Sequence, residues 1–131
     1  MPTIAFLVNE KSDISYECMR ALQSEGFTVY AFYSRERLFA SMRIINPDLI
    51  VWNVSRNMHD AVHSFCELMT VFAVGGRVSV GLIGQSSLEF LANNLLEQGL
   101  IDFSLLGKVS PAVLLEHVRS SLSHKLVEHT L

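Results

Sequence analysis

Short apolar runs alternate along the chain with longer stretches in which apolar residues recur every three or four positions. The short runs are rich in β-branched and aromatic residues, and this pattern predicts buried strands. The central run, within Pro47–Ser55, is apolar on both faces, as is typical of a strand in a parallel sheet that helices cover on each side. The predicted strands are Thr3–Val8, Thr28–Tyr33, the run within Pro47–Ser55, Val78–Ile83 and Phe103–Leu106.

The stretches between these runs carry start and stop signals of helices. Ser34 is suited to cap the second helix, and Ser110-Pro111 places proline after a capping serine at the start of the last one. Ser86–Glu89 has the spacing of a capping box. Gly26 is suited to end the first helix, and Asn46-Pro47 stops the second. The expected core-facing residues are Ile14, Cys18, Ala21 and Leu22; Leu38, Met42 and Ile45; Val62, Phe65, Cys66, Met69 and Phe72; Phe90, Leu91, Leu95 and Leu96; and Leu115, Val118, Leu122 and Leu126.

Strict alternation of strands and helices predicts a parallel sheet with helices on both faces. Right-handed crossovers leave few topologies, and five strand–helix units favour the flavodoxin-like strand order 2-1-3-4-5. The fold class is therefore α/β, a three-layer αβα sandwich built as (βα)5. Residues 1–131 suffice for one domain around one core.

Composition narrows the class of protein further. Hydrophobic residues make up 50% of the chain and charged residues 18%, a balance that excludes wholesale disorder. The net charge is −3 and the ten Lys and Arg residues are scattered, so direct nucleic-acid binding is not expected. The apolar runs are too short to span a membrane, and Met1–Ile4 lacks the pattern of a signal peptide, so we expect a cytoplasmic location. Cys18 and Cys66 are interpreted as buried thiols.

Polar residues follow the predicted strands at the edge where parallel folds place their chemistry. The ends of strands one and three carry Asn9-Glu10 and Asn53, while Ile83-Gly84 ends strand four and Lys108 follows strand five. In this arrangement the chain resembles, over nearly its whole length, the receiver domain of bacterial response regulators, the family of two-component signalling. The resemblance rests on Phe6–Glu10, Pro47–Asn53, Gly81–Gly84 and Phe103–Lys108.

The resemblance implies a set of functional positions, and this chain fills most of them with other residue types. The family's Mg²⁺-binding acidic pair matches Asn9-Glu10, and its phosphoacceptor aspartate matches Asn53. The hydroxyl residue of strand four matches Ile83, and the aromatic switch residue of strand five matches Leu105. The family's lysine is retained as Lys108.

These replacements remove the chemistry of phosphorylation. An aspartyl phosphate forms by attack of a carboxylate, and Asn53 offers only a neutral carboxamide. The single carboxylate of Glu10 is a weak Mg²⁺ site, and phosphoryl transfer without the metal loses its main charge neutralisation. We therefore expect no catalytic residue, no metal and no cofactor. Asn53 is expected to bond Lys108 through its amide oxygen, and Glu10 to form a simple ion pair with Lys108.

Other polar residues near the predicted crevice favour structural roles. Ser55 and Ser86 are loop hydroxyls that a serine kinase could reach, but turn and cap roles are commoner for such serines. His59 and His63 are four residues apart, a spacing that can hold a metal on one helix face, yet no carboxylate motif surrounds them.

The sequence thus predicts a pseudo-receiver and not an enzyme: a phosphorylation-independent interaction or dimerisation module in signal transduction or transcriptional regulation. Its partner would be another protein or a second copy, and the chain would be a whole protein or the N-terminal domain of a longer regulator. The alternative is a flavodoxin-like sensor that binds a small ligand in the vacated crevice. In proteins that the chain resembles, the fourth helix, strand five and the fifth helix form the usual partner surface. The candidate interface residues are Phe90, Leu91, Asn94, Leu105, Val113, His117 and Ser121.

Overall fold

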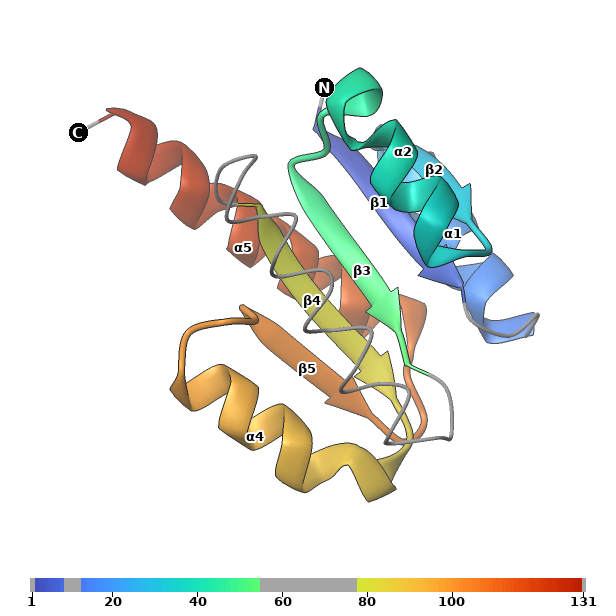
Figure 1. Cartoon of the computed structure of the whole chain (residues 1–131), viewed down its shortest axis with the longest axis vertical. Coiled ribbons are helices and arrows are strands. Elements are labelled where there is room, and N and C mark those ends of the chain that lie inside the picture. Colours follow the sequence, from blue (N-terminus) through green and yellow to red (C-terminus); the bar gives the residue numbers. More distant parts are fainter. Residues whose placement is uncertain (1, 9–12, 55–77, 131) are drawn as a thin grey trace.

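The computed structural model describes residues 2–8, 13–54 and 78–130, and the third predicted helix lies outside them. Five described strands form one parallel sheet in the order β2-β1-β3-β4-β5, which confirms the predicted topology (Figure 1). The strands are β1 (Thr3–Val8), β2 (Thr28–Phe32), β3 (Leu49–Asn53), β4 (Ser79–Gly84) and β5 (Phe103–Leu106).

Helices cover both faces of the sheet, so the three-layer architecture is also confirmed (Figure 1). One apolar cluster joins the sheet to α1 and α5, and a second joins its other face to α2 and α4. Alternate residues of β1 supply the two clusters, with Phe6 in the first and Leu7 in the second. The described helices are α1 (Asp13–Ser24), α2 (Arg35–Ile45), α4 (Glu89–Glu97) and α5 (Pro111–Thr130), with a 3-10 turn, η1 (Ser86–Leu88), before α4.

Most predicted helix ends are confirmed by the backbone. The Ser34 hydroxyl accepts a hydrogen bond from the backbone N–H of Arg37 at 3.2 Å, and α5 begins at Pro111. At the end of α1, Gly26 has a positive φ of 94°, and the backbone N–H of Phe27 donates a hydrogen bond to the carbonyl of Leu22 at 3.2 Å.

The capping box predicted for Ser86–Glu89 is wrong. Ser86 lies inside η1 rather than before it, and over this described stretch no side chain caps either η1 or α4. The chain enters α4 through a 3-10 turn, which satisfies the Leu88 N–H with the carbonyl of Gln85 at 3.0 Å.

One predicted core position is wrong. On α4 the buried residues are Ala92 and Leu95, whereas Phe90 is 81% exposed. On α5 the fully buried residues begin at Leu114, and Leu115 is half-buried and packs against the same cluster. The predicted core side chains of Ile14, Leu126 and the helix at 62–72 lie outside the described side chains.

Two aspartates hold neighbouring strands in register. The Asp48 carboxylate accepts a hydrogen bond from the backbone N–H of Thr3 at 2.8 Å. The Asp102 carboxylate accepts one from the backbone N–H of Val80, also at 2.8 Å. In each pair the aspartate N–H donates in return to the carbonyl of the same partner residue. These paired bonds tie β3 to the start of β1 and β5 to the start of β4, which fixes which residues lie side by side further along the sheet.

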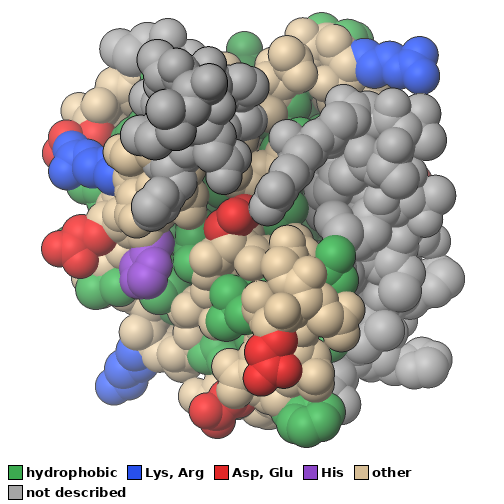
Figure 2. Space-filling view, turned by 90° about the vertical axis from the view of Figure 1, so that its left-hand side faces the viewer, with side chains coloured by type: hydrophobic (Ala, Val, Ile, Leu, Met, Phe, Trp, Pro, Cys, Tyr) green, Lys and Arg blue, Asp and Glu red, His purple; other side chains and the backbone are tan. Residues whose placement is uncertain are grey.

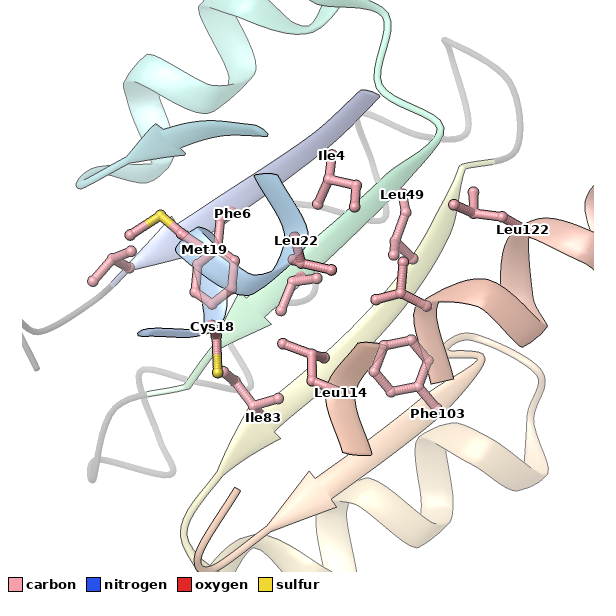
Figure 3. Close-up of a cluster of buried hydrophobic side chains, with 13 residues drawn as sticks. Ile4, Phe6, Cys18, Met19, Leu22, Leu49, Ile83, Phe103, Leu114 and Leu122 are labelled. Carbon is pink, nitrogen blue, oxygen red and sulfur yellow. The ribbon is translucent and has the colours of Figure 1, made fainter. Parts of the chain in front are cut away.

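Gly81 makes room for an aromatic ring inside the sheet's α1–α5 face. It pairs with Phe103 in the β4–β5 ladder, and a Cβ at Gly81 would overlap the Phe103 ring. Phe103 is 5% exposed and belongs to the same buried cluster as Ile4 and Leu122 (Figure 3). Glycine is unfavourable inside a strand, but at position 81 the packing of Phe103 requires it.

The packing of Phe103 on Gly81 generates a stability prediction. Gly81→Ala is expected to lower the free energy of unfolding by about 1–3 kcal/mol, because the ring must leave its place. The same change in a Phe103→Val background is expected to cost less, since valine carries no ring. Urea unfolding of the four proteins measures the coupling between the two sites. An equal cost of Gly81→Ala in both backgrounds would contradict the account.

Candidate functional site

One row of paired residues crosses the sheet at the carboxyl ends of its strands. Val8 pairs with Asn53, Asn53 with Ile83, and Ile83 with Leu105. Side chains of laterally paired residues point to the same face of a sheet, so this row lies on the face that α1 and α5 cover. Three positions singled out from the sequence are thus brought side by side.

The side chain of Asn53 is tied to α1. Its Nδ2 donates a hydrogen bond to the Ser15 hydroxyl oxygen at 2.8 Å, and Ser15 is completely buried. An ionised aspartate has no proton to donate in this way, so the bond depends on the carboxamide. The expected bond from Asn53 to Lys108 is not formed. Lys108 is exposed and makes no hydrogen bond or ion pair with any residue that the structure describes.

Sequence reasoning missed Ser15, although a signal exists. Ser15 stands three and four residues before Cys18 and Met19, both buried, and so lies on the core-facing stripe of α1. A polar residue on such a stripe needs a hydrogen-bond partner inside the protein. Here the partner is Asn53, at the polar end of β3.

Ile83 is the apolar neighbour of Asn53 in this row. It is 2% exposed and packs in the cluster that contains Cys18 and Leu114, as Figure 3 shows. Leu105, the next residue along the row, packs against the same cluster. Burial raises the pKa of the Cys18 thiol to about 11, with a smaller contribution from the negative charge of Glu17. The surroundings of Ile83 therefore disfavour charge.

The aromatic residue of β5 lies two positions before Leu105 and on the same side of the strand. Phe103 is held between Gly81 and α5, with its ring centroid 5.3 Å from that of His117 and the two planes inclined by 36°. Such a tilted contact is a favourable aromatic arrangement. The ring is therefore fixed inside the protein, away from the end of the strand.

Several candidates from the sequence cannot be placed. The predicted ion pair of Glu10 with Lys108 stays a prediction, because Glu10 lies outside the described residues. Among the side chains that the structure describes, no group of three His, Cys, Asp or Glu could hold a metal ion. No helix within the described ranges is long and apolar enough to cross a membrane. The other candidates outside the described residues are Asn9, Ser55, His59, His63 and Cys66.

A cavity of about 340 Å³ lies apart from this row, between α4 and β5. Neither Asn53 nor Lys108 contributes to its lining. The cavity lies on the α4 side of the sheet, and Ser86 and Leu106 place it near the carboxyl ends of β4 and β5. Its lining residues are Ser86, Glu89, Asn93, Ser104 and Leu106.

The candidate interface spans α4, β5 and α5. Its two most exposed hydrophobic residues are Phe90, 81% exposed, and Val113, 42% exposed. Figure 2 shows this side of the molecule, where hydrophobic side chains reach the surface among acidic, basic and histidine side chains. The half-buried members are Leu91, Asn94, Leu105, His117 and Ser121.

Comparison with known proteins identifies the fold. No protein-family model and no curated protein sequence matches the chain. A CheY-like response regulator receiver domain protein from Methanospirillum hungatei JF-1 superposes with a TM-score of 0.79 at 15% identity, covering 98% of both chains. A receiver domain protein from Clostridium thermocellum gives 0.77 at 15% identity, covering 97% of this chain and 98% of that one.

A response regulator from Thermotoga maritima gives a TM-score of 0.76 at 20% identity, over 93% of this chain and 98% of that one. Identities this low establish the fold and leave function to be argued from the site. The chain has the receiver-like fold of response regulators, with the sheet order 2-1-3-4-5.

Proposed function

We propose that this chain is a pseudo-receiver, a signalling module that works through protein–protein interaction without being phosphorylated. The observation that carries the proposal is Asn53. It ends β3 at the receiver crevice, and its carboxamide donates a hydrogen bond to the buried hydroxyl of Ser15. Fold likeness alone would favour an ordinary receiver, whereas Asn53 and its row favour a pseudo-receiver.

Asn53 and its neighbours in the row lack the groups that phosphoryl transfer requires. The Asn53 carboxamide is a poor nucleophile, because its nitrogen lone pair is delocalised and its oxygen carries no full charge. Ile83 presents hydrocarbon where a phosphoryl group would need a hydrogen-bond donor, and Leu105 stands where the family has its aromatic switch residue. Lys108 lies outside the row and is the family position whose residue type is unchanged, but a lysine alone supplies charge without a nucleophile or a metal site.

The exposed hydrophobic residues of the α4–β5–α5 side support a partner surface. A phenylalanine as exposed as Phe90 leaves a large apolar area in water, and a bound protein would remove it. The inward position of Phe103 does not depend on phosphorylation, because Gly81 and His117 already hold the ring. We infer that this surface has one constant form that a partner protein or a second copy recognises, in signal transduction or transcriptional regulation.

A small-ligand sensor is the second candidate, and the cavity between α4 and β5 is the observation in its favour. Its lining is mostly hydroxyl, amide and carboxylate groups, which suits a polar ligand. Asn53 and Lys108 are not among the described residues that line that cavity. A sensor would therefore bind its ligand on the α4 side of the sheet, and a rise in melting temperature with a bound metabolite would support it.

The proposal predicts no phosphorylation even after the acceptor is restored. Wild-type protein and Asn53→Asp, each incubated with acetyl phosphate and Mg²⁺, are expected to keep their intact masses. Ile83 still offers no hydroxyl to a phosphoryl group, and Asn9-Glu10 still supplies only one carboxylate for Mg²⁺. A receiver that retains its aspartate serves as the positive control. A mass increase of about 80 Da on either protein, the weight of a phosphoryl group, would contradict this reading.

A second prediction concerns the partner surface. Phe90→Ala is expected to weaken capture of a partner by about tenfold or more, as for an aromatic hot spot, while the free energy of unfolding changes by less than about 0.5 kcal/mol. Ile44→Ala is the matched control, because Ile44 is 84% exposed but lies on α2. Quantitative pull-down with the immobilised chain measures both. Equal losses from the two variants would count against the α4–β5–α5 surface.

A further inference from the structure

The described strands β2 and β5 form the two edges of the sheet, and the residues of β2 are the more exposed. Every residue of β5 is buried or half-buried, whereas Thr28, Tyr30 and Ala31 of β2 are exposed. Figure 1 shows β2 on the opposite side of the sheet from β5 and α4. An open strand edge presents unpaired backbone N–H and C=O groups to which another strand can bind.

The β2 edge lacks the usual protection against pairing. Its sequence, Thr-Val-Tyr-Ala-Phe, contains no charged residue, proline or glycine. All three tyrosines of the chain lie around it: Tyr16 is 39% exposed, Tyr30 44% and Tyr33 51%. The hydroxyls of Tyr16 and Tyr33 share a hydrogen bond, which raises the pKa of Tyr33. Exposed tyrosines are typical of binding surfaces, because they supply large contact area at low entropic cost.

We propose that β2 binds β2 of a second copy of this chain, antiparallel and centred on Tyr30, so that the two sheets become continuous. The proposal concerns a surface other than the α4–β5–α5 side and does not depend on the absence of phosphorylation. It leaves that side free for a different partner.

The backbone of β2 sets the register. The N–H of Thr28 donates to the carbonyl of Pro2 at 3.2 Å, toward β1. Backbone groups of successive residues in a strand point to opposite sides, so Thr28, Tyr30 and Phe32 face β1 while Val29 and Ala31 face outward. When two copies pair about Tyr30, Val29 lies opposite the second copy's Ala31. These two residues exchange both hydrogen bonds, and the symmetry repeats the exchange on the other side.

The side chains fit the same register. Tyr30 then lies opposite its own copy in a non-hydrogen-bonded pair, where side chains approach most closely and an aromatic pair is favourable. Thr28 lies opposite Phe32, and no like charges meet because the strand has none. The strand is therefore its own complement, which favours a second copy over an unrelated peptide as the occupant.

The first test separates this edge from the other candidate surface. Sedimentation of the wild-type chain is expected to show a monomer–dimer equilibrium. Ala31→Pro removes an outward-facing N–H from each copy without touching the β1 ladder, and is expected to raise the dissociation constant about 10- to 100-fold. Ile44→Ala, an exposed residue of α2, is the control and should leave the dimer unchanged, and Phe90→Ala tests the α4–β5–α5 side in parallel. A wild-type chain that stays monomeric, or a dimer lost in Phe90→Ala but kept in Ala31→Pro, would overturn the proposal.

Two variants of opposite charge at Tyr30 test whether a loss of the dimer comes from misfolding. Tyr30→Lys and Tyr30→Glu each place like charges opposite one another at the two-fold axis, so each variant alone should be mostly monomeric. Mixed in equal amounts, they should form a one-to-one dimer, because unlike charges then meet. Failure of the mixture to associate while both variants keep the wild-type melting temperature counts against the register.

A disulfide test reports the register directly. Cα atoms in a non-hydrogen-bonded antiparallel pair are about 4.5 Å apart, which is within disulfide reach, so Tyr30→Cys should give a covalent dimer under mild oxidation. Thr28→Cys, whose symmetry mate lies four pairs away, should not. The wild-type chain controls for the native cysteines. Cross-linking by Thr28→Cys in preference to Tyr30→Cys would show a different pairing.

Discussion

The hydrogen-bonded register of the parallel sheet is the constraint on which the rest of this structure depends. Asp48 and Asp102 each clamp the start of a neighbouring strand, so β1 and β3, and likewise β4 and β5, cannot slip past one another. A slip by one residue would turn every side chain to the opposite face. These clamps set Val8 beside Asn53 and Ile83 beside Leu105, and the β3–β4 ladder sets Asn53 beside Ile83 on the face that α1 and α5 cover. The chemistry of the crevice follows from those residues.

Two interactions beside this row hold side chains of the site in place. The carboxamide of Asn53 is bonded to Ser15, and the ring of Phe103 is bound between Gly81 and His117. As a pseudo-receiver, the function proposed above, the module would present a constant surface to a partner. Its regulation would then come from expression, partner availability or assembly rather than from a kinase.

The sequence predicts the strands and their order well, because apolar runs and strict alternation have few alternative solutions. Side-chain detail on helices was harder to predict. Leu114 and Leu115 are adjacent and equally apolar, so periodicity alone cannot choose the buried one, and Phe90 is apolar yet exposed. The Ser15–Asn53 bond joins residues 38 apart in sequence, and it becomes visible only once α1 is laid on β3. Local patterns cannot reveal a contact that depends on tertiary packing.

The central claim is that the crevice around Asn53 does not accept a phosphoryl group. The most direct test is an NMR titration of the uniformly ¹⁵N-labelled chain with Mg²⁺ and beryllofluoride, which together mimic an aspartyl phosphate in a receiver that has its aspartate. The account predicts that the amide resonances of Val8, Asn53, Ile83 and Leu105 keep their positions throughout. Saturable shifts along that row, with fluoride bound at the end of β3, would contradict it.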